Sequence, residues 1–211
     1  MAEYQLYGFG ESGNSYKAAL MLELTGCDWS LIPVDFFAGV TRQEPFRRDV
    51  NAMGEAPVLL HDGRSLTQSG VILDYLAEKT GRFGPGDADE RREILRWILF
   101  DNHKFSGSYA PLRFLRGLQK KGESEVTEFL RGRARNAFEI VEKHLAGRSF
   151  MVADRPTIAD LSLAGYIYYE EETGFPLSDY LHIAAWAARI AALPGWKHPY
   201  DLMPRAMKPG S

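Results

Sequence analysis

Two serines and an asparagine stand close together near the N-terminus, in the segment Gly10-Glu-Ser-Gly-Asn-Ser-Tyr-Lys17. The segment follows a predicted strand, Tyr4 to Phe9, and leads into a predicted helix, Ser15 to Thr25. Because the N-terminal end of a helix carries partial positive charge, a hydroxyl there could help to hold a bound anion. The structural alternatives are a loop hydroxyl at Ser12 and an ordinary helix cap at Ser15.

A second segment, Gly54 to Tyr75, has the residue types of a peptide-binding site. Ala56-Pro57 precedes a predicted strand, Val58 to Leu60, and a cis bond there would turn the Ala56 backbone outward, toward a peptide along the sheet edge. Ser69 is predicted to cap the next helix, whose free N–H groups suit a carboxylate. The segment could therefore receive a short extended peptide with an α-carboxylate. On local pattern alone, a strand–hairpin–helix unit with a structural proline is favoured.

The elements that must position these side chains alternate between strands and helices. Asp62-Gly63 is a strong hairpin signal and leads to a second strand, Ser65 to Thr67. Trp29 to Val34 is a further predicted strand, near an edge because it contains a proline. Gly26 and Gly81 are predicted to end the first and last helices of this region. The order strand, helix, strand, short helix, two strands, helix predicts a small α/β layer structure.

The second half of the chain is helical in pattern. Thr80 to Gly86, rich in Gly and Pro, predicts a linker. Ile94 to Phe105 is a predicted helix, and a Ser-Gly-Ser break separates it from an apolar stretch, Tyr109 to Leu118. Thr157 and Asp160 predict a reciprocal capping box at the start of a buried helix. The remaining predicted helices are Ser124 to Leu145 and Leu181 to Leu193.

Two motifs, Asn-Ala-Met-Gly-Glu-Ala-Pro-Val-Leu and Leu-Thr-Gln-Ser-Gly-Val-Ile-Leu-Asp-Tyr-Leu, resemble the glutathione-binding half of the cytosolic glutathione transferases. The resemblance extends over nearly the whole chain, and Thr157-Ile-Ala-Asp160 resembles the capping motif of their C-terminal domain. It implies a thioredoxin-like domain at residues 1–80, then an all-helical domain at residues 87–211, in a homodimer. The serine-type bacterial enzymes, similar to the phi, zeta and beta kinds, are the implied relatives.

In such an enzyme glutathione is the co-substrate and supplies the nucleophile. A thiol with a pKa of about 8.5 is mostly protonated at neutral pH, so a hydroxyl donor beside a helix end would stabilise the thiolate. The resemblance implies this role for Ser12, five residues before Lys17, with Asn14 and Ser15 as alternatives or helpers. The implied glutathione-binding residues are Arg42, Glu55, Ala56, Pro57, Gln68, Ser69, His103 and Lys104.

The electrophile would lie in an apolar cleft. Its implied lining residues are Phe9, Phe105, Tyr109 and Phe114. An aromatic stripe at this spacing is usually part of a core, and His103-Lys104 could equally be an ordinary surface pair. The structural and functional interpretations of these residues both stay open at this point.

Three positions depart from the family pattern. Gln68 stands where the family commonly has Glu, so the γ-glutamyl ammonium group loses a charged partner. Glu55 stands where Gln or Lys is frequent and is a poor neighbour for the glycyl carboxylate. Compensating cations are available at Arg42, Arg47 and Lys104. Ser12 is not the cysteine of other kinds of transferase, so mixed-disulfide chemistry is not expected.

The composition limits the class of protein, its partners and its cellular location. The chain has 211 residues, 45% hydrophobic and 25% charged, with a net charge of −3, as expected of a soluble globular protein with no nucleic acid or membrane partner. The single cysteine, Cys27, excludes an internal disulfide, and no metal-ligand spacing is visible. No signal peptide is visible, so a cytoplasmic location is expected.

The predicted function is conjugation of glutathione to small apolar electrophiles, as in detoxification. Isomerisation or peroxide reduction would use the same activated thiolate. The alternative is a non-catalytic glutathione-binding or interaction module on the same fold, because fold does not determine function.

Overall fold

The structure is a computed structural model, and it describes residues 2–169, 171 and 173–206. The chain divides into two compact units. One runs to Arg82 and also includes the segment from Leu193 onward, whereas the other is Phe83–Ala192. The final segment therefore packs with the first unit, although the predicted ranges grouped it with the second. Within the described residues, no helix combines the length and the apolar character that a membrane span requires.

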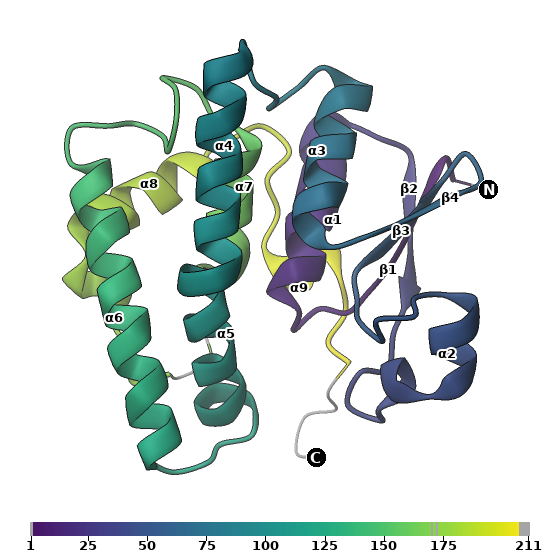
Figure 1. Cartoon of the computed structure of the whole chain (residues 1–211), viewed down its shortest axis with the longest axis horizontal. Coiled ribbons are helices and arrows are strands. Elements are labelled where there is room, and N and C mark those ends of the chain that lie inside the picture. The colour runs from purple at the N-terminus through teal and green to yellow at the C-terminus, as the bar shows by residue number, and fades with distance from the viewer. Residues whose placement is uncertain (1, 170, 172, 207–211) are drawn as a thin grey trace. The chain divides into compact units, whose positions relative to one another are not determined.

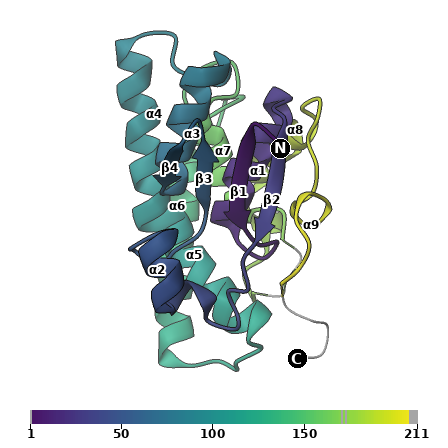
Figure 2. The ribbon, with the colours of Figure 1, turned by 90° about the vertical axis from the view of Figure 1, so that its right-hand side faces the viewer.

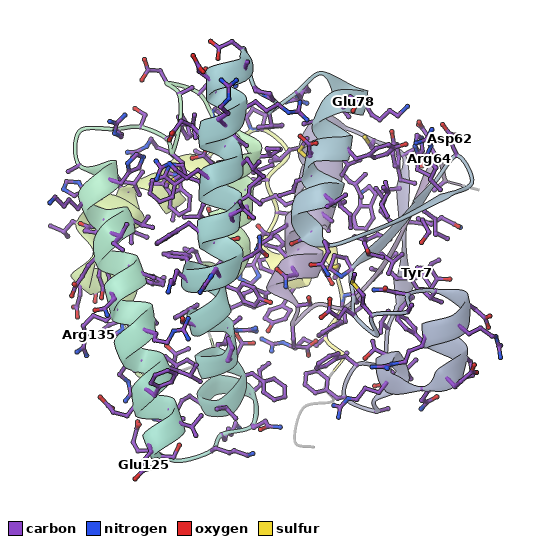
Figure 3. The ribbon with its side chains drawn as sticks, in the orientation of Figure 1. Tyr7, Asp62, Arg64, Glu78, Glu125 and Arg135 are labelled. Carbon is purple, nitrogen blue, oxygen red and sulfur yellow. The ribbon has the colours of Figure 1, made fainter. Side chains whose placement is uncertain are left out.

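A four-stranded sheet forms the centre of the first unit. Its strands are β1 (Tyr4–Gly8), β2 (Trp29–Pro33), β3 (Val58–His61) and β4 (Arg64–Thr67), in the order β2-β1-β3-β4. β2 runs parallel to β1, whereas β3 and β4 are antiparallel to their neighbours. Asp62 and Gly63 both have positive φ, 49° and 70°, which confirms the predicted hairpin. Figure 3 shows Asp62 and Arg64 together at this turn.

Two long helices lie side by side against the sheet (Figures 1 and 2). They are α1 (Gly13–Thr25) and α3 (Ser69–Thr80), which end at the predicted residues Gly26 and Gly81 in left-handed conformation. Between β2 and β3 lie a 3₁₀ turn, η1 (Val40–Arg42), and the short helix α2 (Glu44–Asp49). The final segment contributes α9 (Pro199–Leu202), which contacts α1. The N-terminal ends of α1 and α3 point to the same edge of the unit (Figure 1).

Both predicted helix caps in this unit are wrong. α1 begins two residues early, because the N–H of Ser15 donates to Oγ of Ser12, which makes Ser12 the cap. α3 has Gln68 at its N-cap position, so Ser69 is its first helical residue. At α1 the path of the preceding loop decides that Ser12 reaches the helix, whereas α3 receives no side-chain cap from Gln68.

The second unit consists of helices. α4 (Ala88–Phe100) continues without interruption through η2 (Asp101–Phe105), α5 (Ser106–Arg113) and η3 (Phe114–Leu118), and the predicted Ser-Gly-Ser break is wrong. The reason is that Oδ1 of Asp101 accepts hydrogen bonds from the N–H and the hydroxyl of Ser106, within a π-helical turn. The other helical elements of this unit are α6 (Glu125–Leu145), α7 (Ile158–Leu163), η4 (Ala164–Tyr166), η5 (Leu177–Asp179) and α8 (Leu181–Ala191).

The long helix α6 is amphipathic, with charged side chains on its exposed side and apolar side chains on its buried side. Figure 3 shows Glu125 at its start and Arg135 on its outer side, and both are exposed. Ala134 and Phe138 are buried on the other side. The ring of Phe138 stacks on Phe105 at 4.2 Å, so the core of this unit is largely aromatic. The two units together confirm the predicted fold, a thioredoxin-like α/β part followed by an all-helical part.

The capping box before α7 is confirmed. The N–H and hydroxyl of Thr157 donate to Oδ2 of Asp160 at 2.8 and 3.0 Å. The other carboxylate oxygen of Asp160 accepts from the Met151 N–H at 2.8 Å and from Nε1 of Trp186 at 2.9 Å. Burial raises the pKa of Asp160, while these four donors act in the opposite direction. This carboxylate thus joins three segments of the helical unit.

Candidate functional site

Ser12 lies at the end of the loop between β1 and α1, with 7% of its surface exposed. Its Oγ accepts the Ser15 N–H at 3.1 Å. A hydroxyl that accepts one hydrogen bond keeps its own O–H for another acceptor. The first turn of α1 contains no acidic residue, so no carboxylate there offsets the positive end of the helix. The Ser12 hydroxyl is therefore a possible donor at the start of α1.

The two residues predicted to help Ser12 lie in different surroundings. Ser15 is fully buried, and its Oγ has no hydrogen-bond partner among the described residues. A Cβ on Gly8 would come within 3.0 Å of this Oγ, so Ser15 packs against the backbone of β1. Asn14 is half-buried, and its Oδ1 accepts from the Ser69 hydroxyl at 3.4 Å. Asn14 thereby joins the starts of α1 and α3.

The final segment of the chain supports the Ser12 loop. The Gly10 N–H donates to the Pro204 carbonyl at 3.1 Å, and the Ala206 N–H donates to the buried Glu11 carboxylate at 2.9 Å. A Cβ on Gly10 would lie 2.6 Å from carbonyl oxygens of Met203 and Pro204, which only glycine avoids. Sequence reasoning missed this support, since the two segments lie at opposite ends of the chain.

The Ala56 segment is shaped by a nearby asparagine that sequence reasoning missed. The Ala56-Pro57 bond is cis. β3 begins only at Val58, so the N–H and C=O of Ala56 precede the strand. Nδ2 of the buried Asn51 donates to the Glu55 carbonyl at 2.8 Å, and its Oδ1 accepts the Met53 N–H at 3.0 Å. An asparagine three residues before a glycine was the available signal for such a turn.

Gln68 and Glu55, the two departures from the family pattern, are in direct contact. Nε2 of Gln68 donates to Oε2 of Glu55 at 2.9 Å and to the sulfur of Met53 at 3.4 Å. Gln68 has φ 67° and ψ 117°, and its side chain makes no cap to α3. Such a backbone costs a non-glycine residue on the order of 1–3 kcal/mol and is concentrated at functional sites.

Of the candidate cations, Arg47 lies at this segment. Gly54 has φ 68°, and a Cβ on it would lie 2.9 Å from Nε of Arg47. The Arg47 side chain therefore lies over the backbone that leads into Ala56. Arg42 ends η1 and is exposed. The sequence indicated Arg47 only as a compensating charge, whereas the structure places its side chain beside Gly54 of this segment.

Phe9 packs inside the first unit. Its ring stacks on Phe36 at 4.8 Å and meets the edge of Phe37 at 6.1 Å, in a cluster that also includes Phe46. Phe9 is 8% exposed, while Phe36 and Phe37 are half-buried. Phe36 and Phe37, which follow β2, therefore present a partly exposed apolar surface beside Phe9. The sequence analysis did not predict a role for these two residues.

The five predicted site residues of the helical unit differ in how deeply they are buried. His103 and Lys104 are exposed on η2, and Phe114 is half-buried on η3. Phe105 is 1% exposed and Tyr109 is 4% exposed, so both belong to the core of this unit. The roles predicted for these five residues toward glutathione or an electrophile stay predictions.

Tyr109 also lines a cavity of about 480 Å³ within the helical unit. Its lining among the described residues is Tyr109, Tyr169, Glu171, Thr173, Gly174, Phe175, Pro176 and Leu177. At its wall, the buried Arg113 pairs with Glu171 at 3.0 Å and lies 3.7 Å from the centre of the Tyr169 ring. Three aromatic rings, those of Tyr109, Tyr169 and Phe175, line this cavity together with a few polar groups.

A metal centre and a cysteine nucleophile are the alternative kinds of site, and the described residues arrange neither. The described residues contain no cluster of His, Cys, Asp and Glu that could hold a metal ion. Cys27 is half-buried, with its sulfur 3.2 Å from the Thr25 hydroxyl. The Ser12 loop, the Ala56 segment and the start of α3 are therefore the strongest candidate site.

Known proteins resemble this chain in sequence and in fold. A family model for the glutathione S-transferase N-terminal domain matches residues 2–78, and one for the C-terminal domain matches residues 106–194. The chain is 33% identical to a maleylacetoacetate isomerase of Rhizobium meliloti over 174 residues, 79% of this chain and 81% of the relative. It is 27% identical to glutathione S-transferase 3 of Zea mays over 222 residues, 100% and 99% of the two chains. A crystal structure of a glutathione S-transferase from Xanthobacter autotrophicus superposes with a TM-score of 0.86 at 34% identity, covering 94% of this chain and 98% of that one.

Proposed function

The chain belongs to the glutathione S-transferase family, and from this premise we propose that it binds glutathione and stabilises its thiolate for attack on a small apolar electrophile. The observation that carries the proposal is Ser12 at the N-cap of α1, with an O–H left to donate. The thiolate sulfur would accept this hydrogen bond beside the positive end of α1.

The rest of glutathione is proposed to follow the edge of the first unit. Its γ-glutamyl carboxylate would meet Ser69 and the free N–H groups of α3, as the Asn14–Ser69 contact brings the two helix ends together. The cysteinyl backbone would pair with Ala56, and the glycyl carboxylate would lie toward Arg47 or Arg42. His103 and Lys104 of η2 remain proposed contributors from the helical unit.

The thiolate would form a bond to an electrophilic carbon of the second substrate. In a substitution, a leaving group would depart with the electron pair of the bond that breaks; in an addition to a double bond, the carbanion that forms would take up a proton. Phe36 and Phe37 are proposed as apolar walls beside the predicted Phe9. Isomerisation is a second candidate, because the relative from Rhizobium meliloti is a maleylacetoacetate isomerase. It would use the same thiolate in a reversible addition to a double bond.

A homodimer is also proposed, since two-fold dimers are the commonest assemblies of soluble proteins. Light scattering at micromolar concentration tests it, and a mass equal to that of one chain, 23.8 kDa, would contradict it.

Ser12 variants test the mechanism. Because Ser12 caps α1, Ser12→Ala would also cost roughly 0.5–2 kcal/mol of stability, whereas Gly at an N-cap costs only a few tenths. Ser12→Gly is therefore the cleaner way to remove the donor, and Ser12→Thr keeps both the cap and the hydroxyl. We expect bound glutathione in the wild type to have a thiol pKa below the free value of about 8.5, read from thiolate absorbance.

In Ser12→Gly this pKa should rise toward the free value, and the turnover rate should fall about 10- to 100-fold, since α1 still contributes its dipole. Ser12→Thr should behave like the wild type. If Asn14→Ala or Ser15→Ala raises the pKa while Ser12→Gly does not, another residue activates the thiol. If the wild type binds glutathione without lowering the pKa and turns over no electrophile of a broad panel, the chain is a glutathione-binding module.

A further inference from the structure

The amide of Gln68 has a fixed orientation. Both of its N–H groups have partners, one in the carboxylate of Glu55 at 2.9 Å and one in the sulfur of Met53 at 3.4 Å. An amide side chain has two N–H donors and one carbonyl acceptor. The carbonyl oxygen of Gln68 is therefore the part that remains for a ligand, and it can only accept hydrogen bonds.

The Glu55 carboxylate is held beside this carbonyl. Its main chain is fixed by Asn51, and its Oε2 is fixed by Gln68. Among the described residues no cation pairs with Glu55, and its side chain is exposed. The result is a negative charge and a neutral acceptor side by side, directly before the first helical residue of α3.

The backbone of Gln68 makes this contact possible. Its positive φ of 67° turns the side chain of a non-glycine residue away from the helix that it precedes. The side chain gives up capping of α3 and reaches Glu55, which is 13 residues away in sequence. A strained residue that is held in place by several contacts is typical of a binding position.

The γ-glutamyl end of glutathione carries an ammonium group and a carboxylate on the same carbon. The proposed place for the carboxylate is the start of α3, where N–H groups and the Ser69 hydroxyl donate. The ammonium group then needs acceptors next to that place, and an anion among them.

We propose that Glu55, oriented by Gln68, is the anionic partner of the α-ammonium group of glutathione. The two family departures then form one unit, in which the neutral Gln68 accepts a hydrogen bond and Glu55 supplies the charge. This inference rests on the proposed function. It makes Glu55 a residue that selects ligands with a free amino group.

A pair of ligands isolates this contact. Glutathione and glutaryl-cysteinyl-glycine differ only in that the latter has hydrogen in place of the α-ammonium group. Calorimetry should give the wild type an affinity for glutathione about tenfold or more above that for the glutaryl analogue. Glu55→Gln should lower the affinity for glutathione about tenfold and leave the affinity for the analogue unchanged.

An exchange of the two side chains gives the decisive comparison. In the double variant Glu55→Gln with Gln68→Glu, the carboxylate and the amide trade places, and most of the lost glutathione affinity should return. The matched control is Glu78→Gln, an exposed acid at the opposite end of α3 (Figure 3), which should change neither affinity. Melting temperatures of all variants establish that they are folded.

Failure of the inference is distinct from failure of the proposed function. If the wild type binds neither ligand, the proposed function falls, and the inference falls with it. If the wild type binds glutathione but prefers it no more than the analogue, or if Glu55→Gln weakens both ligands equally, the inference alone is overturned. Equal weakening would mean that Glu55 only supports the shape of the segment.

Discussion

Two helix N-termini in this molecule are built in opposite ways. At α7, Thr157 and Asp160 cap each other, and the carboxylate is fully buried with four donors around it. At α3, the N-cap residue Gln68 is exposed, has positive φ and gives no side-chain hydrogen bond to the helix. The protein itself satisfies the polar groups at the N-terminus of α7, whereas at α3 the first N–H groups receive no side-chain cap and can bind a ligand.

The difference shows that a helix end serves either the core or a ligand. A carboxylate already placed at the α7 terminus satisfies the groups that a bound anion would need. The first turn of α3 has no acidic residue, so its positive end is not offset in this way. α1 is intermediate, because Ser12 caps it through its oxygen and keeps an O–H to donate.

The strongest way to break the comparison is Asp160→Ala. It leaves the donors of Met151, Thr157 and Trp186 without their acceptor inside the core. Unsatisfied buried groups cost about 1–3 kcal/mol each, so we expect a loss of unfolding free energy on the order of 3–5 kcal/mol. Urea denaturation measures it. Asp154→Ala, an exposed acid of the same loop, should change stability by less than about 0.5 kcal/mol. Equal losses in the two variants would contradict a special role of the α7 terminus.

Ser69→Ala tests whether the N-terminus of α3 binds the γ-glutamyl carboxylate of glutathione. Ser69 is the first helical residue of α3, and among the described residues its hydroxyl hydrogen-bonds only to Asn14, at 3.4 Å, so the fold should change little. Glutathione affinity should fall by roughly 1–3 kcal/mol, the scale of a hydrogen bond to a charged group. Calorimetry checks this against Ser65→Ala, an exposed serine on β4. An unchanged affinity would remove the γ-glutamyl carboxylate from this place.

Gln68→Gly gives the smallest and most specific effect. Glycine accepts positive φ without strain, so stability should stay level or rise by up to about 1 kcal/mol, while glutathione affinity falls. The control is Gln43→Gly. Gln43 is also an N-cap glutamine without a side-chain cap, but its φ is −75°, so it has no strain to release. If Gln68→Gly loses as much stability as an ordinary glycine substitution in an element interior, the backbone at Gln68 is not strained.

Features confined to a few consecutive residues could be predicted. The Asp62-Gly63 hairpin, the terminating glycines Gly26 and Gly81 and the Thr157–Asp160 box are all as predicted. Each depends on backbone conformations and hydrogen bonds within about four positions, so the residue types alone specify them. The order of these local elements was enough to indicate the α/β unit followed by helices.

The choice among competing local options could not be predicted. Ser12 rather than Ser15 caps α1, because the loop from β1 brings Ser12 to the helix and packs Ser15 against Gly8. The predicted break at Ser106 is absent, because Asp101 binds that serine inside a π-helical turn. In both places the sequence allowed two hydrogen-bonding patterns, and the tertiary structure selected one.

The sequence by itself thus determined the four strands and most of the helices, and its family resemblance predicted Ser12, Ala56 and Ser69 as groups that meet a thiol peptide. Only the tertiary structure decided that Glu55 meets Gln68, that Asn14 meets Ser69, and that the final segment returns to hold Gly10. These contacts join residues 13, 55 and 194 positions apart, and no local preference encodes them. They form because burial of the sheet and of α1 brings their loops to one edge, where each polar group takes the partner within reach.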